Sequence, residues 1–154
     1  MKTLVISGGS SGIGKATASL FAERGWRVFE LSRHGGEEAK VERFEAKDAG
    51  EIIHVFCDVC SEESCHAAIE EVWRQTDHVD VVISNAGYGI SGPIEFTDIK
   101  DAEHQMDVNF MGAVRFTQAV LPQLRQQRRG RIIYTSSVAA ILAVPYQSFY
   151  SASK

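Results

Sequence analysis

The sequence lacks long hydrophobic runs. None of its apolar segments approaches the roughly 18 residues that a membrane-spanning helix needs. The short apolar run near the start ends in glycines, and a secretory signal peptide needs a longer run followed by a cleavage site. These absences predict a cytoplasmic protein that has no membrane partner.

An excess of positive charge is also absent. The chain has 16 Lys and Arg against 20 Asp and Glu, which gives a formal net charge of -4. Binding to nucleic acid needs a basic face that neutralises phosphates, so nucleic acid is not expected as a partner. With 44% hydrophobic residues and this small net charge, bulk disorder is excluded as well.

Cysteine is scarce, and its three copies form an odd number, Cys57, Cys60 and Cys65. A disulfide framework is not expected in a chain of this kind. Cys57 and Cys60 make a C-x-x-C pair, but a zinc site needs a second ligand pair, and the nearby His54 and His66 fit no standard spacing. The pair also lies near a helix start, where a redox role is conceivable. We favour plain thiols and expect no metal site.

Proline is rare too, with three copies, and no linker, repeat or low-complexity stretch divides the chain. A chain of 154 residues has the size of one ordinary domain. We therefore expect residues 1–154 to form a single domain.

Short apolar segments alternate with helical patterns along the chain. The expected strands are 3–9, 27–32, 51–59, 79–87 and 130–137. The expected helices are 12–24, 37–49, 61–74, 98–127 and a last one from about 148. The segment 98–127 is expected in two pieces, with Pro122 bending or breaking its last part. This alternation predicts βαβ units, and hence an α/β fold of the Rossmann type with a doubly wound parallel sheet in three layers.

A glycine-rich loop joins the first strand to the first helix. Gly8, Gly12 and Gly14 have the spacing G-x-x-x-G-x-G, which lets the backbone pass close to a pyrophosphate at the positive end of a helix. A rival reading takes Gly9 to Lys15 as the phosphate loop of nucleoside triphosphatases, but Ala16 follows where that motif needs a hydroxyl for Mg²⁺. The remaining alternative is a plain glycine-rich turn.

The end of the second strand bears on the choice of dinucleotide. An NAD site usually has an acidic residue there, on the ribose hydroxyls. This strand ends in Ser32 and Arg33, which leave no carboxylate to repel a 2′-phosphate and offer a cation to hold it. Glu30 lies two residues earlier, inside the expected strand. We expect NADP(H) to be preferred over NAD(H), the alternative being a solvated loop arginine at position 33.

Tyr150 and Lys154 form a Y-x-x-x-K pair near the end of the chain. On a helix, positions four apart share one face, so the phenol and the ammonium become neighbours. A nearby cation favours the phenolate, which lets a tyrosine exchange a proton with an alcohol or a carbonyl. Ser137 at the end of the fifth strand offers a hydroxyl for the reacting oxygen. Asn109 is unfavourable in a helix by propensity, which suggests a special role, although a packing or surface asparagine is the alternative.

These motifs together resemble the short-chain dehydrogenase/reductase family, and the resemblance spans the whole chain. The cofactor loop has Ser7 where Thr is usual, Asp58-Val59 matches the pair that contacts adenine, and Ser84 replaces the first Asn of the Asn-Asn-Ala-Gly motif. The resemblance and the loop chemistry together predict these cofactor-binding residues: Gly8, Ser10, Ser11, Gly12, Ile13, Gly14, Ser32, Arg33, Asp58, Val59, Asn85, Ala86, Gly87, Tyr150 and Lys154.

The resemblance also implies catalytic roles. Tyr150 is expected as the general acid/base, with Lys154 stabilising its phenolate and binding the nicotinamide ribose. Ser137, favoured over Ser136 by its interval to Tyr150, positions the substrate oxygen. Asn109 holds a water in a proton relay toward Lys154. The implied reaction is hydride transfer between NADP(H) and a secondary alcohol or a ketone or aldehyde.

Members of this family continue well beyond the position that matches Lys154. We therefore expect a sheet that lacks the family's last strands and helices, with the fifth strand as an exposed edge and the Tyr-Lys pair on a fraying helix end. Two readings follow, part of a working reductase that forms a homodimer or homotetramer, or a truncated, catalytically inactive dinucleotide-binding module.

Substrate contacts are expected from the segment around Pro145. Together with Ser137, they are Ala139, Val144 and Tyr146, with residues 88–90 opposite. Because these side chains are mostly apolar or aromatic, we expect a hydrophobic small-molecule alcohol or carbonyl such as a steroid, a retinoid or a lipid-like ketone.

Overall fold

The computed structural model describes residues 1–34, 40–43 and 50–154 and contains one mixed sheet. The six strands lie in the order β3-β4-β2-β1-β5-β6, and all pairs are parallel except β3 with β4. Their bounds are β1 Thr3–Ser7, β2 Arg27–Ser32, β3 Lys40–Arg43, β4 Glu51–Phe56, β5 Val81–Ser84 and β6 Arg131–Tyr134. The predicted α/β fold with a doubly wound parallel sheet is confirmed.

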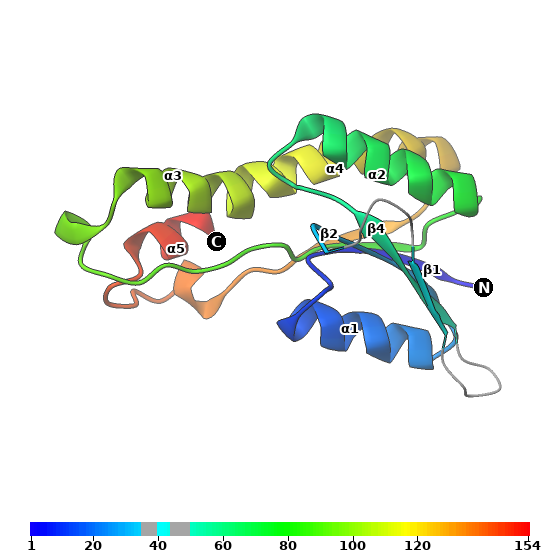
Figure 1. Ribbon diagram of the computed structural model, residues 1–154, viewed down its shortest axis with the longest axis horizontal. Helices are drawn as coiled ribbons and strands as arrows, with labels where there is room; N and C mark the ends of the chain where they lie inside the picture. Colours follow the sequence, from blue (N-terminus) through cyan, green and yellow to red (C-terminus); the bar gives the residue numbers. More distant parts are fainter. Residues whose placement is uncertain (35–39, 44–49) are drawn as a thin grey trace.

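Helices cover both faces of this sheet and give the three predicted layers (Figure 1). Helix α1, Gly12–Glu23, lies on one face, and α2, Glu62–Gln75, lies with α4, Gly112–Gln127, on the other. Ser61 caps α2 as predicted, since its side chain accepts a hydrogen bond from the Ser64 amide. None of the described helices is long and apolar enough to cross a membrane.

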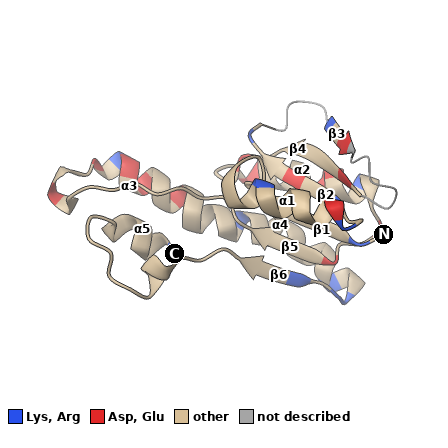
Figure 2. Ribbon diagram, turned by 90° about the horizontal axis from the view of Figure 1, so that it is seen from below, with Lys and Arg blue, Asp and Glu red and all other residues tan. Residues whose placement is uncertain are grey.

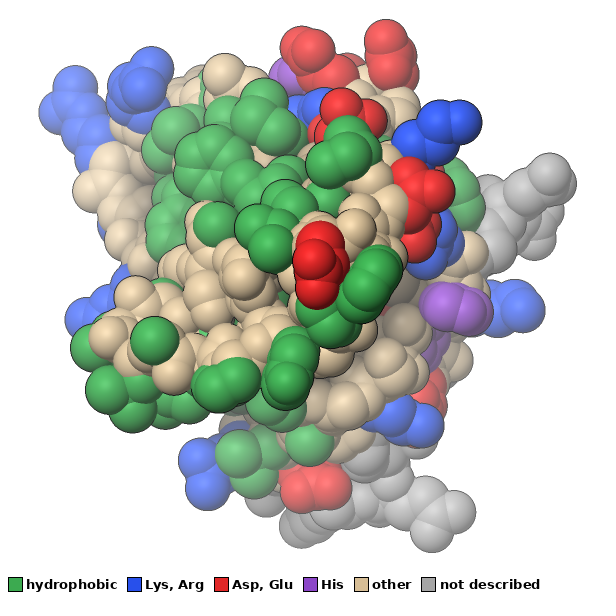
Figure 3. Space-filling model, turned by 90° about the vertical axis from the view of Figure 1, so that its left-hand side faces the viewer, with side chains coloured by type: hydrophobic (Ala, Val, Ile, Leu, Met, Phe, Trp, Pro, Cys, Tyr) green, Lys and Arg blue, Asp and Glu red, His purple; other side chains and the backbone are tan. Residues whose placement is uncertain are grey.

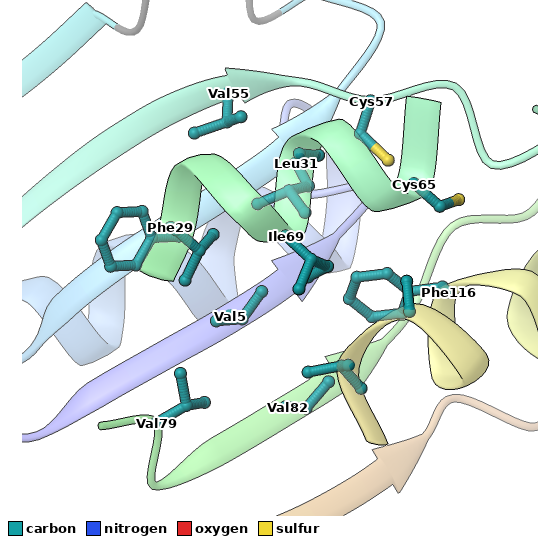
Figure 4. Close-up of a cluster of buried hydrophobic side chains, with 14 of the residues drawn as sticks. Val5, Phe29, Leu31, Val55, Cys57, Cys65, Ile69, Val79, Val82 and Phe116 are labelled. Carbon is teal, nitrogen blue, oxygen red and sulfur yellow. The ribbon is translucent and has the colours of Figure 1, made fainter. Parts of the chain in front are cut away.

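The core is divided by the sheet because successive strand residues point to opposite faces. Leu4 and Ile6 of β1 pack with Ala18 and Ala22 of α1. Val5, between them, packs on the other face, among side chains of β2, β4, α2 and α4 (Figure 4). Every residue of β1 is buried, which explains why this strand reads as a continuous apolar run rather than an alternating one.

The second predicted helix, 37–49, is wrong where the structure describes it. Residues Lys40–Arg43 form β3, which pairs antiparallel with β4 and places Lys40 opposite His54. A surface helix and an edge strand both expose charged side chains, so charge alone did not separate them. Pairing with β4 supplies backbone hydrogen bonds, and these stabilise the strand over a helix. Residues 37–39 and 44–49 of this prediction lie outside the described residues.

The long helical segment 98–127 is interrupted, but not at the proline. It consists of α3, Ile99–Met106, a π-helical turn over Asp107–Met111, and α4, which continues through Pro122. Pro122 lies on the exposed side of α4, where the carbonyl that loses its partner can be hydrated. The predicted division into two pieces is confirmed, and it falls around Asn109. The predicted break at Pro122 is wrong, because α4 runs through the proline, and a bend there stays a prediction.

The α3 end of the molecule projects beyond the sheet. Helix α5, Ser148–Ser153, lies beside α3 past the carboxyl ends of the strands (Figure 1). Figure 2 shows β3 and β6 at opposite edges of the sheet. Strand β6 is exposed, with Ile133 42% and Tyr134 53% accessible, as expected for an unpaired edge.

Candidate active site

A cleft of about 760 Å³ runs along the carboxyl ends of the strands, from the glycine loop to α5. All fifteen predicted cofactor-binding residues line it, and so does Ser137. Three of the predicted substrate residues, Ala139, Val144 and Tyr146, do not line this cleft. Their role stays a prediction. Tyr88 and Gly89, predicted opposite them, do line it.

The glycine loop has a backbone that only glycine fits at two points. Gly8 has a φ of +67°, and a Cβ on it would lie 2.7 Å from Ala86 Cα. A Cβ on Gly14 would collide with the carbonyl oxygen of Gly8. Helix α1 begins within this loop, at Gly12, with no side-chain cap from Ser11 and no acidic residue in its first turn. Its first amides can therefore donate hydrogen bonds to an anion, as a pyrophosphate site requires.

Side-chain hydrogen bonds join the loop to two neighbouring strand ends. The Ser7 hydroxyl accepts from the amides of Asn85, at 3.1 Å, and Ala86, at 3.2 Å. Asn85 Nδ2 donates to the Gly8 carbonyl at 3.0 Å, and Thr135 Oγ1 donates to Asn85 Oδ1 at 3.2 Å. The ends of β1, β5 and β6 are thus held in register, which fixes the shape of the cleft.

At the end of β2, the acidic side chain is withdrawn from the cleft. Glu30 is 1% exposed, and its Oε2 pairs with His54 Nδ1 at 2.9 Å and accepts from the Ser32 hydroxyl at 3.3 Å. Arg33 and His34, by contrast, are exposed and line the cleft. This end of the cleft therefore offers basic side chains and no lining carboxylate from β2.

Asp58 also lines the cleft, from the loop between β4, the strand next to β2, and α2. Its Oδ1 accepts from the Cys60 amide at 2.9 Å, and its own amide donates to the Ser64 hydroxyl at 2.9 Å. These two bonds orient the Asp58 carboxylate at the cleft.

The Tyr-Lys pair lies at the far end of the cleft. Lys154 Nζ donates to the Thr135 carbonyl at 3.2 Å and lies 5.9 Å from the centroid of the Tyr150 ring. Glycines make room for both side chains, since a Cβ on Gly87 would lie 3.1 Å from Lys154 Nζ and one on Gly89 would lie 3.2 Å from Tyr150 Cδ2. The Tyr150 phenol and the Lys154 ammonium thus lie close together and pack directly against the backbone of Gly87 and Gly89.

Two adjacent serines follow β6 and have different surroundings. The Ser136 hydroxyl donates to the Lys154 carbonyl at 3.1 Å, which ties the end of α5 to the sheet. The Ser137 hydroxyl accepts from the Ala139 amide at 3.2 Å. That bond leaves the Ser137 hydrogen able to donate to an oxygen in the cleft.

Asn109 lies behind this group, in the π-helical turn, and is 6% exposed. Its Nδ2 donates to the Tyr88 carbonyl at 2.7 Å and to the Ser153 hydroxyl at 2.9 Å, and its Oδ1 accepts from the Tyr88 amide at 2.9 Å. Asn109 does not line the cleft but borders a neighbouring hollow of about 410 Å³ together with Lys154. Both donors of the amide are in use, so a water bound by this side chain would bind at Oδ1.

Sequence reasoning missed several residues of the cleft. His34, His104 and Gln147 line it without belonging to any motif. His34 directly follows Ser32 and Arg33, the two residues predicted to favour NADP(H), and this position was the one available signal in the sequence. His104 and Gln147 reach the cleft only through the packing of α3 and of the turn before α5.

Known proteins are similar to this chain over nearly its whole length. The profile of the family described as short chain dehydrogenase matches residues 2–154. A 3-ketodihydrosphingosine reductase of Bacteroides thetaiotaomicron is 38% identical over 151 residues, covering 98% of this chain and 52% of the relative. Retinol dehydrogenase 8 of Bos taurus is 36% identical over 157 residues, covering 99% and 50%. The chain thus spans about half the length of these curated relatives.

Solved structures give the same picture of the fold. A xylitol dehydrogenase bound to NAD⁺ superposes with a TM-score of 0.87 at 29% identity, over 99% of this chain and 59% of the other. An alcohol dehydrogenase from the archaeon Thermococcus sibiricus, complexed with 5-hydroxy-NADP, gives a TM-score of 0.85 at 26% identity, over 99% and 65%. Both forms of the dinucleotide therefore occur among the structural neighbours.

Proposed function

Because the chain belongs to the short-chain dehydrogenase family, we propose that it provides the cofactor-binding and catalytic part of an NADP(H)-dependent oxidoreductase. The reaction would interconvert a secondary alcohol and a ketone or aldehyde. One observation carries this proposal: the glycine loop, Ser137, Tyr150 and Lys154 all line the same cleft.

The loop residues fit a dinucleotide. The glycine-only backbone at Gly8 and Gly14 and the uncapped start of α1 together form a cradle for a pyrophosphate. When bound, the dinucleotide would supply the hydride in the reduction of a carbonyl and accept it in the oxidation of an alcohol. Asp58 at the adenine end and Lys154 at the ribose end would hold it on either side of this cradle.

Residues of this chain would transfer the proton that the reaction requires. In the reducing direction, Tyr150 donates its phenolic proton to the substrate oxygen, and the Lys154 ammonium stabilises the phenolate that remains. Ser137 donates a hydrogen bond to the same oxygen and so orients the carbonyl carbon. Asn109 fixes the Tyr88 backbone opposite Tyr150 and retains one acceptor position at Oδ1 for a relay water.

Support for NADP(H) over NAD(H) comes from the end of β2. Glu30 is buried against His54, whereas Arg33 and His34 line the cleft. A 2′-phosphate carries negative charge that these basic side chains can pair with, and Glu30 is too far buried to bind ribose hydroxyls.

Support for a hydrophobic substrate comes from the surface around α5. Figure 3 shows hydrophobic side chains gathered on the end of the molecule that α3 and α5 form. Among the exposed residues of this region are Phe96 at 81%, Val138 at 72% and Ile141 at 86%. The two relatives named above are a 3-ketodihydrosphingosine reductase and a retinol dehydrogenase, and both names refer to lipid-like molecules. Cytoplasmic location and a homodimer or homotetramer remain predictions from the sequence.

The test is turnover with a long-chain ketone or retinal, followed through NADPH absorbance. Tyr150→Phe should lower the turnover rate by about 10²- to 10⁴-fold, because the general acid is lost, with little change in the dissociation constant for NADPH. Near-normal turnover in this variant would contradict the assignment of Tyr150. NADPH binding without reduction of any ketone by the unmodified chain would favour the alternative, a dinucleotide-binding module without turnover.

A further inference from the structure

Three side chains of metal-ligating type converge beside the cleft, outside the group assigned to catalysis. They are Cys60, from the loop after β4, and His104 and Asp107, from the junction of α3 with the π-helical turn. One ligand atom from each residue lies within 4.8 Å of those from the other two. No step of the proposed reaction uses this cluster.

The fold builds the cluster from two elements that are far apart in the sequence. His104 and Asp107 are three residues apart on a continuous helical path, so their side chains share one face. Arg115 connects this face to the loop that carries Cys60, since its guanidinium donates to Asp107 Oδ1 at 2.7 Å and to the Val59 carbonyl at 3.3 Å. The three side chains are thus held together by the packing of the helix against the loop.

We propose that Cys60, His104 and Asp107 form a binding site for one thiophilic divalent cation such as Zn²⁺, with water as the fourth ligand. Thiolate, imidazole and carboxylate are the three side-chain ligand types that Zn²⁺ accepts in proteins, and a site with three protein ligands and one water is a common arrangement. This proposal does not depend on the proposed function.

The distances are within reach of such a site. Bonds of about 2.0–2.3 Å in a tetrahedron place neighbouring ligand atoms about 3.5 Å apart. The ligand atoms of the cluster lie within 4.8 Å of one another, so each pair needs to approach by about 1.3 Å or less. His104 is exposed and Cys60 is half-buried, so rotations of these two side chains can close the gap without moving the backbone.

Without a bound cation, the Cys60 sulfur carries a proton. Burial and a hydrogen bond to Asp107 raise the pKa of the Cys60 thiol to about 12. Burial works against the charged form of Asp107 as well, but hydrogen bonds from Arg115 and Cys60 leave its pKa lowered. Cation binding would break the S–H bond of Cys60 and form a sulfur–metal bond, while one proton goes to solvent.

Charges around the cluster are compatible with a divalent cation. The Cys60 thiolate and the Asp107 carboxylate contribute two negative charges, and Asp58 lies near Cys60. Arg115 contributes one positive charge, but it engages only Oδ1 of Asp107. The second carboxylate oxygen is the one that would coordinate the metal.

Titration of the metal-free 154-residue chain with Co²⁺ tests the site directly. Co²⁺ takes the same tetrahedral ligands as Zn²⁺, and a bound thiolate gives it a charge-transfer absorption band in the near ultraviolet. We expect one equivalent of Co²⁺ to produce this band and one equivalent of Zn²⁺ to remove it. Affinity should rise with pH, because the Cys60 proton must leave.

Variants separate this site from adventitious binding. Cys60→Ser should abolish the charge-transfer band while Cys57 and Cys65 remain present. His104→Gln should weaken Co²⁺ binding by more than about 100-fold, since the loss of even an outer-shell partner of a metal site costs about 10- to 100-fold. The matched control is His66→Gln, a half-exposed histidine on α2 outside the cluster, which should leave binding unchanged. Thermal melts without metal check that each variant is folded.

Three results would overturn the proposal. The first is the absence of a charge-transfer band in the unmodified chain at millimolar Co²⁺. The second is a band that persists in folded Cys60→Ser, which would make another cysteine the ligand. The third is equal weakening by His104→Gln and His66→Gln, which would indicate surface histidine binding.

Discussion

At the scale of single residues, hydrogen bonds direct polar side chains toward or away from the cleft. Glu30 is the clearest case, because an acidic residue near the end of β2 suggests NAD in sequence, yet His54 and Ser32 hold it in the interior. The sequence placed Glu30 inside the strand, and its burial confirms this. What the sequence did not contain was the identity of its partner, His54 on the neighbouring strand.

Arg33→Ala tests whether a single side chain holds the 2′-phosphate of NADPH. The variant should raise the dissociation constant for NADPH about 10- to 100-fold, the equivalent of a lost charge-assisted hydrogen bond of about 1.5–3 kcal/mol. Binding of NADH, which has no 2′-phosphate, should change little. Fluorescence titrations with both dinucleotides measure this, and Lys15→Ala, which removes a cation from outside the cleft, is the control. Equal losses for NADPH and NADH would show that Arg33 does not hold the phosphate.

At the scale of elements, the π-helical turn links the helix that carries Tyr150 to the rest of the molecule. Asn109 in this turn binds both backbone groups of Tyr88 and the Ser153 hydroxyl of α5. A six-residue helix forms only marginally by itself, so α5 depends on contacts of this kind. Asparagine is poorly suited to a helix, and this was the signal that singled out Asn109 in the sequence.

Replacing Asn109 should therefore loosen α5. In Asn109→Ala, the Tyr88 amide and carbonyl lose a buried partner, which costs about 1–3 kcal/mol. Amide hydrogens of α5 should exchange faster in this variant, as measured by hydrogen–deuterium exchange. The control is Gln118→Ala on the exposed face of α4. Unchanged protection of α5 in Asn109→Ala would mean that other contacts hold the helix.

The predictions from sequence were wrong for two elements, β3 and α4. The charged segment around β3 has no strong period, and its pairing with β4 is a contact between segments that the sequence alone does not show. Pro122 suggested a break, but α4 continues through it, because a proline is tolerated on the exposed side of the helix. In both cases, local propensity was outweighed by the position of the segment in the fold.

At the scale of the whole molecule, the topology brings the functional residues together. Parallel strands place their carboxyl ends on one side of the sheet, so motifs after β1, β2, β4, β5 and β6 meet in one cleft. The sequence predicted this convergence because each motif follows an apolar strand. It did not predict the cluster of Cys60, His104 and Asp107, whose members belong to no common motif.

The two edges of the sheet differ in their protection. Strand β3 has charged residues along its length, whereas β6 exposes Ile133 and Tyr134. An unprotected edge pairs with other chains, so the 154-residue chain should associate as its concentration rises. Ile133→Lys should reduce this association in light-scattering measurements, and Val41→Lys on β3 should have little effect. Association that is insensitive to both changes would place the contact elsewhere.

The most direct test of the central claim is a fluorescence titration of the purified chain with NADPH and, in parallel, with NADH. We expect saturable binding that favours NADPH and is lost in Gly14→Ala, where the added Cβ collides with the Gly8 carbonyl oxygen. Gly92→Ala, where the nearest atom to the added Cβ is Thr97 Oγ1 at 3.6 Å, should bind as the unmodified chain does. Absence of binding to either dinucleotide, or equal binding by Gly14→Ala and Gly92→Ala, would contradict the account.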